Sequence, residues 1–279
     1  MNTTPPTDPS DFRIGPFVVV RHVAQGGMGA VYEVTDPDTN ARYAMKLGAM
    51  AGQEDERFGR IHAALSRLTH EGIVESHGVG ETPDGRTYQL LDFVDGQPAQ
   101  VFAKSMGPPG CEPRTTAVIT IAIHVAEALA YLHAHDIIHR DLKSANVLVR
   151  TDRSACLIDF GSALMPGIEA APGRFVGTYT YAPPEQLDAG AVDHRSDLYS
   201  FGVLLYRMLS GVRPFNGDTT ESLIQQHLHL VPNPLDQQVN GISPRVVQLV
   251  AQLLEKDPNA RPQRADSVAA ILRASAACV

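Results

Sequence analysis

Cysteine is scarce in this chain, and its spacing excludes several kinds of site. The 279 residues contain three cysteines, Cys111, Cys156 and Cys278. No two of them are close in the sequence, so neither a zinc-binding pair nor a disulfide framework is indicated. We therefore expect free thiols, as in a protein of the reducing cytoplasm.

Basic residues are fewer than acidic ones. The chain has 23 lysines and arginines against 31 aspartates and glutamates, which gives a net charge of −8. A protein with this charge is not drawn as a whole to the phosphate backbone of nucleic acids. Nucleic acid is therefore not an expected partner, although a local basic groove remains compatible with the composition.

Long apolar runs are also lacking. We expect no segment to reach the roughly 20 residues that a membrane-spanning helix needs, and the first residues lack the basic and apolar parts of a secretion signal. These absences predict a cytoplasmic protein with no membrane span. Residues 1–11 are rich in proline, threonine and aspartate and are expected to form a flexible leader.

What the chain does contain is a β-rich first part, residues 12–94, followed by a helical part, residues 95–279. We expect an α+β fold with a small β-rich lobe, a larger helical lobe and a ligand cleft between them. In the first part, strands are predicted over Phe17–Val23, Ala30–Thr35, Tyr43–Leu47, Ile73–Val79 and Thr87–Phe93, and a helix over Glu54–Leu68. In the second part, helices are predicted over Thr115–Ala134, Ser196–Ser210, Thr220–Leu230, Pro244–Glu255 and Ala265–Ser275, and short strands over Val147–Val149 and Cys156–Ile158.

A glycine cluster, Gln25-Gly-Gly-Met-Gly-Ala30, lies between the first two predicted strands. Glycines at such a tip let the backbone approach a ligand, so phosphate binding is one interpretation and a plain hairpin is the other. Lys46 ends the next apolar strand. Taken alone, a lysine on a strand most often only reaches solvent.

The segment His139-Arg-Asp-Leu-Lys-Ser-Ala-Asn146 is more specific, because it combines charged and amide groups between two apolar runs, and Asp159-Phe-Gly161 follows it. Asn146 and Asp159 offer oxygen atoms, which Mg²⁺ prefers. Asp141 would take or orient a hydroxyl proton, and Lys143 would neutralise charge on a transferring phosphoryl group. This order of residues favours phosphoryl transfer over a solvated loop.

Together these motifs resemble those of protein kinases, most closely the bacterial serine/threonine kinases of the eukaryotic (Hanks) type. The likeness covers about Phe12 to Leu272. The matching segments are Ala24–Val31 for the family's G-x-G-x-x-G-x-V, Ala44–Lys46 for A-x-K, His139–Asn146 for the catalytic loop and Asp159–Gly161 for the metal-binding triplet.

The resemblance implies a bilobal kinase fold that transfers the γ-phosphoryl group of ATP, with Mg²⁺, to serine or threonine hydroxyls of a protein substrate. It implies that Asp141, Lys143 and Lys46 are catalytic and that Asn146 and Asp159 hold the metal. The residues that it places around ATP are Val23, Gly26, Gly27, Gly29, Val31, Ala44, Lys46, Leu148 and the backbone of Asp92 to Val94.

The resemblance also implies supporting contacts outside the reacting groups. Asp197 is expected to brace the catalytic loop, and Arg261 to pair with Glu185. His139 is expected to pack near Phe160. The other histidines, including His62, His124, His133 and His135, lack metal-like partners at useful spacing, and we expect them to pack or to lie at the surface.

Two departures from the family pattern concern the first lobe. Ala24 stands where the first loop glycine belongs, which predicts a stiffer or slightly displaced loop. Ile61 stands where the family has the glutamate that pairs with the strand lysine; Glu54 or Glu56 would substitute only if the helix were shifted. We hypothesise that Lys46 pairs mainly with Asp159 or with nucleotide phosphate, which gives a weak or conditional enzyme.

A third departure concerns the segment from Ser162 to Val176, which has no hydroxyl residue after Ser162. Arg140 beside the catalytic aspartate usually indicates a pocket for a phosphate on this segment. Here the nearby acceptors are Thr178, Tyr179 and Thr180, and Glu169 would imitate the phosphate. We therefore do not expect the usual phosphorylation switch; Thr178 resembles the family's threonine that touches the catalytic aspartate.

Two other functions remain open at this stage. A pseudokinase, meaning a nucleotide-binding scaffold with little turnover, would fit the missing glutamate. A small-molecule phosphotransferase of related fold fits less well, because the Thr178–Glu185 segment resembles a peptide platform. No sensor segment is recognisable within the sequence, so we expect a regulator that acts in trans.

Overall fold

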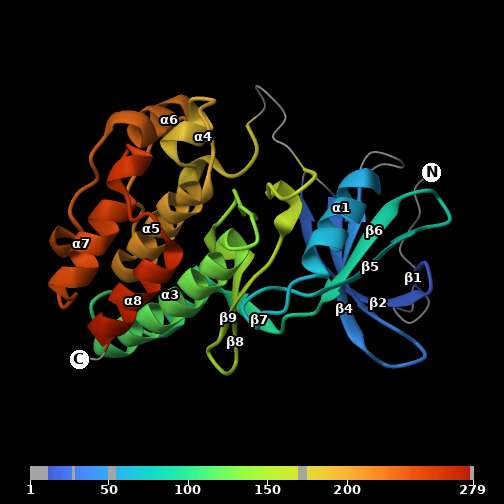
Figure 1. The fold of residues 1–279 in the computed structure, drawn as a ribbon. Coiled ribbons are helices and arrows are strands. Elements are labelled where there is room, and N and C mark those ends of the chain that lie inside the picture. The colour runs from blue at the N-terminus through green and yellow to red at the C-terminus, as the bar shows by residue number, and fades with distance from the viewer. Residues whose placement is uncertain (1–11, 27–28, 50–54, 169–174, 277–279) are drawn as a thin grey trace. The chain divides into compact units, whose positions relative to one another are not determined.

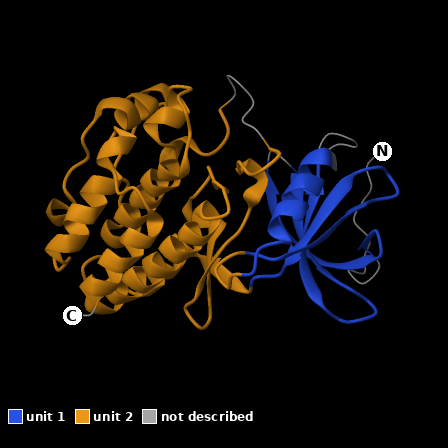
Figure 2. Ribbon diagram, viewed as in Figure 1, with its two compact units in different colours: residues 1–69, 74–94 blue, residues 70–73, 95–279 orange. Residues whose placement is uncertain are grey.

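The computed structural model describes residues 12–26, 29–49, 55–168 and 175–276 of the chain (Figure 1). Two compact units can be distinguished, one formed by residues 1–69 and 74–94 and one by residues 70–73 and 95–279 (Figure 2). The predicted leader, residues 1–11, lies outside the described residues.

Unit 1 is built on a six-stranded antiparallel sheet in the order β1-β2-β3-β4-β6-β5. Its strands are β1 Arg13–Ile14, β2 Phe17–Gly26, β3 Gly29–Thr35, β4 Arg42–Gly48, β5 Ser76–Glu81 and β6 Thr87–Asp92. One face of the sheet carries an apolar core that includes Val34, Met45 and Leu90. The antiparallel pairing predicted for the first three strands is confirmed.

The helix of unit 1, α1 (Asp55–Leu65), packs beside β5 and β6. Phe58, Ile61 and Leu65 recur at intervals of three or four residues, which places them on one face of a helix. Their side chains are buried, with exposures of 1%, 1% and 2%. The predicted helix is confirmed, but it ends at Leu65, before the predicted end at Leu68.

The strand predicted from Ile73 is wrong at its start, because β5 begins at Ser76. Ile73 belongs to unit 2, where it forms a parallel bridge with Leu157, and the amide of Leu157 donates to Gly72 O at 2.8 Å. The apolar pair Ile73 and Val74 is buried. An uninterrupted apolar run does not reveal which strand it will pair with, and here the partner lies far along the chain.

Unit 2 contains the remaining helices and a three-stranded antiparallel sheet, β7-β8-β9 (Figure 1). The strands are β7 Gly96–Pro98, β8 Val147–Arg150 and β9 Ala155–Leu157. The α-helices are α2 Ala99–Ser105, α3 Glu112–His133, α4 Pro184–Leu187, α5 His194–Ser210, α6 Thr220–His229, α7 Pro244–Leu253 and α8 Ala265–Ala276. The five predicted helices of this part are confirmed to within three residues at either end, whereas α2 and α4 were not predicted.

Helix α3 corrects one expectation. By length and composition it is apolar enough to cross a membrane, so the expectation that no segment reaches this limit is wrong. However, 56% of its most apolar window is buried inside the structure. It packs against α5 and α8, and we interpret it as the core helix of unit 2.

Candidate functional site

The backbone of the segment that begins at His139 is held by one buried carboxylate. Asp197, in the first turn of α5, is fully buried and accepts hydrogen bonds from the amides of His139 and Arg140, both at 2.9 Å. Arg140 has a φ of 65°, a left-handed conformation that a non-glycine residue adopts only under constraint. Asp197 supplies that constraint, as expected from the sequence.

His133 also donates to this carboxylate, from Nε2 to Asp197 Oδ2 at 2.9 Å. Burial acts to raise the pKa of Asp197, but the hydrogen bond from His133, the charges of His133 and His139 and the His139 amide outweigh it. The net result is a pKa below the usual value for an aspartate. His133 was expected to pack or to lie at the surface; its hydrogen bond to Asp197 was not predicted.

Asp141 lies at the centre of a second group of contacts. Lys143 Nζ donates to Asp141 Oδ2 at 2.6 Å and to Thr178 Oγ1 at 2.9 Å. Thr178 Oγ1 in turn donates to Asp141 Oδ1 at 2.8 Å. The side chain of Asp141 is only 9% exposed, and that of Lys143 is 25% exposed. Two side chains, one of them 37 residues along the chain, thus converge on the carboxylate of Asp141.

The β8–β9 hairpin brings Asn146 and Asp159 together. Val147 pairs with Leu157 at the end of the hairpin, and just beyond it the amide of Ile158 donates to Asn146 O at 2.9 Å. Asp159 is the next residue and has a φ of 61°. Its carboxylate accepts from the amide of Gly161 at 3.3 Å, at the start of a 3-10 helix over Phe160–Ser162.

The atoms offered by this hairpin fit a hard cation. The amide nitrogen of Asn146 donates to Asp141 O at 2.8 Å and to Asp141 Oδ2 at 3.2 Å. This orientation leaves the amide oxygen of Asn146 for another partner. An all-oxygen set suits Mg²⁺ better than it suits softer metals.

His139 contacts the residues that follow the β8–β9 hairpin, Ile158 and Phe160. Its ring lies 4.9 Å from that of Phe160, which confirms the expected packing. Its Nε2 lies 3.1 Å from Ile158 O, and the amide of Asp141 donates to its Nδ1 at 3.4 Å. These contacts indicate the Nε2–H tautomer, with Nε2 donating to the carbonyl. His139 therefore links the segment of Asp141 to that of Asp159.

Gln186 joins Val176 and Arg140, and Arg140 is the residue before Asp141. Its Nε2 donates to Arg140 O at 3.2 Å and to Val176 O at 2.5 Å. Gly177 lies between these groups with a φ of 123°, and a Cβ there would lie 2.8 Å from Gln186 Nε2. Only glycine fits such a position without a shift of its neighbours.

Glu185, the residue before Gln186, forms a buried ion pair with Arg261. Two bonds of 2.8 Å join Nη1 and Nη2 of the guanidinium to the two carboxylate oxygens. The arginine side chain is fully buried, and Ser196 Oγ donates to Glu185 Oε1 at 2.6 Å. The pairing predicted from the sequence is confirmed.

In unit 1, the register of the sheet places Lys46 with two of the residues predicted to contact ATP. Val31 lies opposite Lys46 in the β3–β4 ladder, and Ala44 lies two residues earlier on β4. Because side chains alternate along a strand, all three project from the same face of the sheet. Lys46 is partly buried.

The glycine-rich segment is described only in part. Gly26 pairs with Gly29, while Gly27 lies outside the described residues. Gly29 has a φ of 130°, and a Cβ there would lie 1.9 Å from Leu47 O, so this position requires glycine. Ala24 pairs with Val31 within the β2–β3 ladder, and the extended strand accommodates its side chain.

Ile61 lies in the buried face of α1, and the next residue, His62, takes part in a polar contact. His62 Nδ1 lies 3.0 Å from Ser76 Oγ, and Gln89 Nε2 donates to the same oxygen at 3.1 Å. Gln89 is the cross-strand neighbour of Lys46. The part of the helix that would carry the family's glutamate is thus apolar at Ile61 and polar at His62.

The other predicted nucleotide contacts lie on separate segments. Val23 is 43% exposed on β2, and Val94 is buried just beyond β6. Asp92 ends β6. Leu148 is partly buried on β8 in unit 2. Glu169, which we expected to imitate a phosphate, lies outside the described residues.

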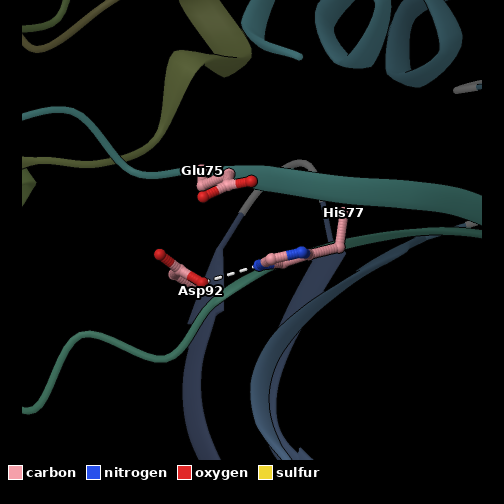
Figure 3. Close-up of side chains that lie close together, drawn as sticks. All are labelled: Glu75, His77 and Asp92. Atoms are coloured by element: carbon pink, nitrogen blue, oxygen red, sulfur yellow. Dashed lines mark hydrogen bonds and ion pairs between the residues drawn. The ribbon is translucent and has the colours of Figure 1, made fainter. Parts of the chain in front are cut away.

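A group of metal-ligand type lies at one end of β5 and β6 in unit 1 and includes Asp92. One ligand atom each of Glu75, His77 and Asp92 lies within 4.8 Å of the others (Figure 3). His77 Nε2 pairs with Asp92 Oδ1 at 2.6 Å. The expectation that the remaining histidines lack metal-like neighbours is therefore wrong for His77.

Sequence reasoning missed the hydrogen bonds of His133 and Gln186. His133 bonds to Asp197, and Gln186 bonds to Arg140 O and Val176 O; neither residue belongs to a motif with a fixed spacing. The signal that would have found His133 is its place six residues before His139, together with the need of a buried aspartate for donors.

Comparison with known proteins agrees with this arrangement. The protein kinase domain family matches residues 17–272. The chain is 38% identical over 277 residues to the serine/threonine-protein kinase pkn2 of Myxococcus xanthus, a match that covers 94% of this chain and 32% of the relative. It is 35% identical over 260 residues to the serine/threonine-protein kinase PknF of Mycobacterium tuberculosis, with 89% and 54% covered.

A third relative is the DNA damage-responsive serine/threonine-protein kinase RqkA of Deinococcus radiodurans, which is 32% identical over 275 residues, with 95% of this chain and 40% of the relative covered. The chain thus spans about a third to a half of the length of these curated relatives. Since the family match extends over most of the sequence and the four kinase motifs occur in order, the chain belongs to the protein kinase domain family.

Proposed function

We propose that this chain is a serine/threonine protein kinase that transfers the γ-phosphoryl group of ATP to hydroxyls of protein substrates. The observation that carries the proposal is the group around Asp141: a nearly buried carboxylate with Thr178 at Oδ1 and both Lys143 and the amide of Asn146 at Oδ2. Phosphoryl transfer needs chiefly this kind of positioning and charge compensation.

Asp141 would accept or orient the proton of the substrate hydroxyl. Its oxygens are held by Lys143, Thr178 and Asn146, so its direction is set before a substrate binds. Lys143 would also offset the charge that develops on the transferred group. The presence of Lys143 two residues after Asp141, and of Thr178 against it, supports serine or threonine as the acceptor.

The residues that we propose to bind the nucleotide are those that match the family's motifs. Lys46 would contact the α and β phosphates, and the segment of Gly26, Gly27 and Gly29 would cover them. The adenine ring would lie among Val23, Val31, Ala44 and Leu148, with its edge read by the backbone of Asp92 to Val94. Asn146 and Asp159 would hold Mg²⁺, which when bound neutralises phosphate charge.

One observation favours a second candidate, a pseudokinase that binds nucleotide with little turnover. Ile61 is 1% exposed and occupies the position of the family's glutamate, so the helix offers an apolar surface there. The two candidates differ in turnover: both would bind MgATP, but only a kinase would release ADP and phosphorylated protein at a rate that depends on Asp141.

The proposal is tested with γ-labelled ATP and two classes of acceptor, generic proteins that are acidic as well as basic, and an aminoglycoside-type alcohol. We expect label on serine and threonine of the proteins, only when Mg²⁺ is present, and much less with Lys46→Met. Label on the alcohol alone would favour a small-molecule phosphotransferase. Binding of MgATP without transfer to either acceptor would favour the pseudokinase.

A further inference from the structure

A cavity of about 350 Å³ lies in unit 2, next to the group around Asp141. Its lining includes Gln100 and Lys104 of α2, Lys143 and Ser144 of the catalytic segment, and Tyr181 and Arg207. Lys143 is shared with the catalytic group, since its Nζ donates to Asp141 Oδ2 at 2.6 Å. A molecule in this cavity would therefore lie one side chain away from the proposed proton acceptor.

The cavity is strongly positive for a protein of this composition. The chain has a net charge of −8 and contains four lysines, of which Lys104 and Lys143 both line this cavity. Arg207 adds a third cation, and none of the described residues that line the cavity carries a carboxylate. A cluster of one sign in a hollow concentrates oppositely charged groups.

Gln100 gives a second and independent observation. Its side chain is buried, with an exposure of 6% for the residue. Among the described residues, neither its Nε2 nor its Oε1 has a hydrogen-bond partner. A buried amide without hydrogen-bond partners costs free energy, and such a group often marks a place where a ligand binds. Its backbone is already held, because the amide of Gln100 donates to Ser144 Oγ at 2.8 Å.

The other lining groups are positioned rather than free. Arg207 Nη1 donates to the hydroxyl of Tyr181 at 2.7 Å, which fixes the guanidinium at the wall of the cavity. Lys104, in the last turn of α2, is exposed and lines the same cavity. The cavity thus combines a hydrogen-bonded cation, an exposed cation and an amide donor, all of which suit an anionic group with several oxygens.

We propose that this cavity binds an anionic side chain of the protein substrate, a carboxylate or a phosphorylated residue that lies near the acceptor hydroxyl. The inference rests on the proposed kinase function and adds a substrate class to it: acidic rather than basic sequences. The chain as a whole has an excess of acidic residues, so the rest of its surface repels an acidic substrate segment. This repulsion makes the preference of the cavity more selective.

The test uses serine peptides of equal length that carry one glutamate, phosphoserine, alanine or lysine at each position in turn on either side of the acceptor. We expect one or two neighbouring positions at which glutamate or phosphoserine raises kcat/KM about five- to tenfold over alanine, while lysine lowers it. Comparison of the glutamate peptides with the phosphoserine peptides shows which anion the cavity prefers.

Two variants and one control identify the cavity as the cause. Lys104→Glu should reverse the preference toward lysine, and Gln100→Leu should weaken it while the chain unfolds at an equal or higher temperature. Arg245→Glu makes the same change of charge at an exposed position of α7, outside the cavity, and should leave the preference unchanged. A preference for basic peptides, or an acidic preference that survives Lys104→Glu, would overturn the proposal.

A separate measurement distinguishes failure of this inference from failure of the proposed function. Peptides with alanine in place of the acceptor serine are titrated calorimetrically, so that binding is observed without phosphoryl transfer. Tighter binding of the acidic peptide to the unaltered chain than to Lys104→Glu supports the cavity even if no transfer occurs. Equal binding to both would reject the cavity even if transfer is rapid.

Discussion

Thr178 Oγ1 donates a 2.8 Å hydrogen bond to Asp141 Oδ1 across 37 residues of sequence. The same hydroxyl accepts from Lys143 Nζ at 2.9 Å, so the threonine completes a closed set of three contacts around the carboxylate. The segment that follows residues 169–174 is in this way joined to the catalytic segment. A substrate hydroxyl would meet a carboxylate whose direction is already determined.

This contact predicts that Thr178→Ala lowers the rate of phosphoryl transfer about 10- to 100-fold, because Asp141 and Lys143 lose a shared partner and their positions loosen. Thr178→Ser keeps the hydroxyl and should retain most of the activity. Initial rates with γ-labelled ATP at saturating peptide measure the effect. Equal rates for the alanine and serine variants would show that the hydroxyl does not matter.

Ile61→Glu is predicted to raise the rate of phosphoryl transfer, about tenfold, since it returns a carboxylate to the helix position from which kinases orient the strand lysine. The same change places a charge at a site that is 1% exposed. We therefore also expect a loss of about 2 to 4 kcal/mol in the free energy of unfolding.

Ile61→Gln is the matched control, because it has the shape of glutamate without the charge. It should lose stability without a gain in rate. No increase in rate for Ile61→Glu, with the fold intact by circular dichroism, would reject the hypothesis that this position limits turnover.

Glu185→Gln is predicted to destabilise the chain by about 3 kcal/mol, because the fully buried guanidinium of Arg261 would lose its counter-charge. Glu127→Gln removes a comparable carboxylate from an exposed pair with Arg273 and should cost less than about 1 kcal/mol. Urea unfolding at neutral pH measures both. A similar small loss for the two variants would contradict a structural role for the buried pair.

His227 is predicted to make stability depend on pH. Burial, together with the positive charge of Lys256, lowers the pKa of this histidine from 6.5 to about 3. Between these values the unfolded chain binds more protons than the folded one, so stability is present above pH 6.5 and is lost as the pH falls below it. The contribution of His227 between pH 6.5 and 4.5 is about 2 to 3 kcal/mol.

His227→Gln should therefore flatten the dependence of the urea midpoint on pH over this range. The neutral form is supported by the Tyr199 hydroxyl, which lies 3.0 Å from His227 Nδ1 and whose pKa is raised by burial, so that the hydroxyl keeps its proton to donate. His229→Gln, at an exposed position two residues later, should leave the slope unchanged. Parallel slopes for all three proteins would contradict the prediction.

The parts of the fold that follow local periodicity were predictable from the sequence. Helix α5 and strands β3 and β4 lie within two residues of their predicted bounds. Asp141, Asn146 and Asp159 were assigned by motif spacing, and the structure brings them to adjacent segments because the β8–β9 hairpin pairs the residues between them.

The parts that depend on distant partners were not predictable. Ile73 joins β9 of unit 2 through a bridge to Leu157, which no local pattern indicates. His133 reaches Asp197 across 64 residues, and Gln186 reaches Arg140 across 46. Such contacts arise from tertiary packing, where one hydrogen bond satisfies a buried polar group. They produce no periodic pattern in the sequence.

The most direct test compares the unaltered chain with Asp141→Asn at matched occupancy by MgATP. The account predicts that calorimetry shows similar nucleotide affinity for both, and that the transfer of labelled γ-phosphate to a serine peptide falls by about 10²- to 10⁴-fold in the variant. A transfer rate unchanged by Asp141→Asn would contradict the assignment of Asp141 as the group that receives the substrate proton.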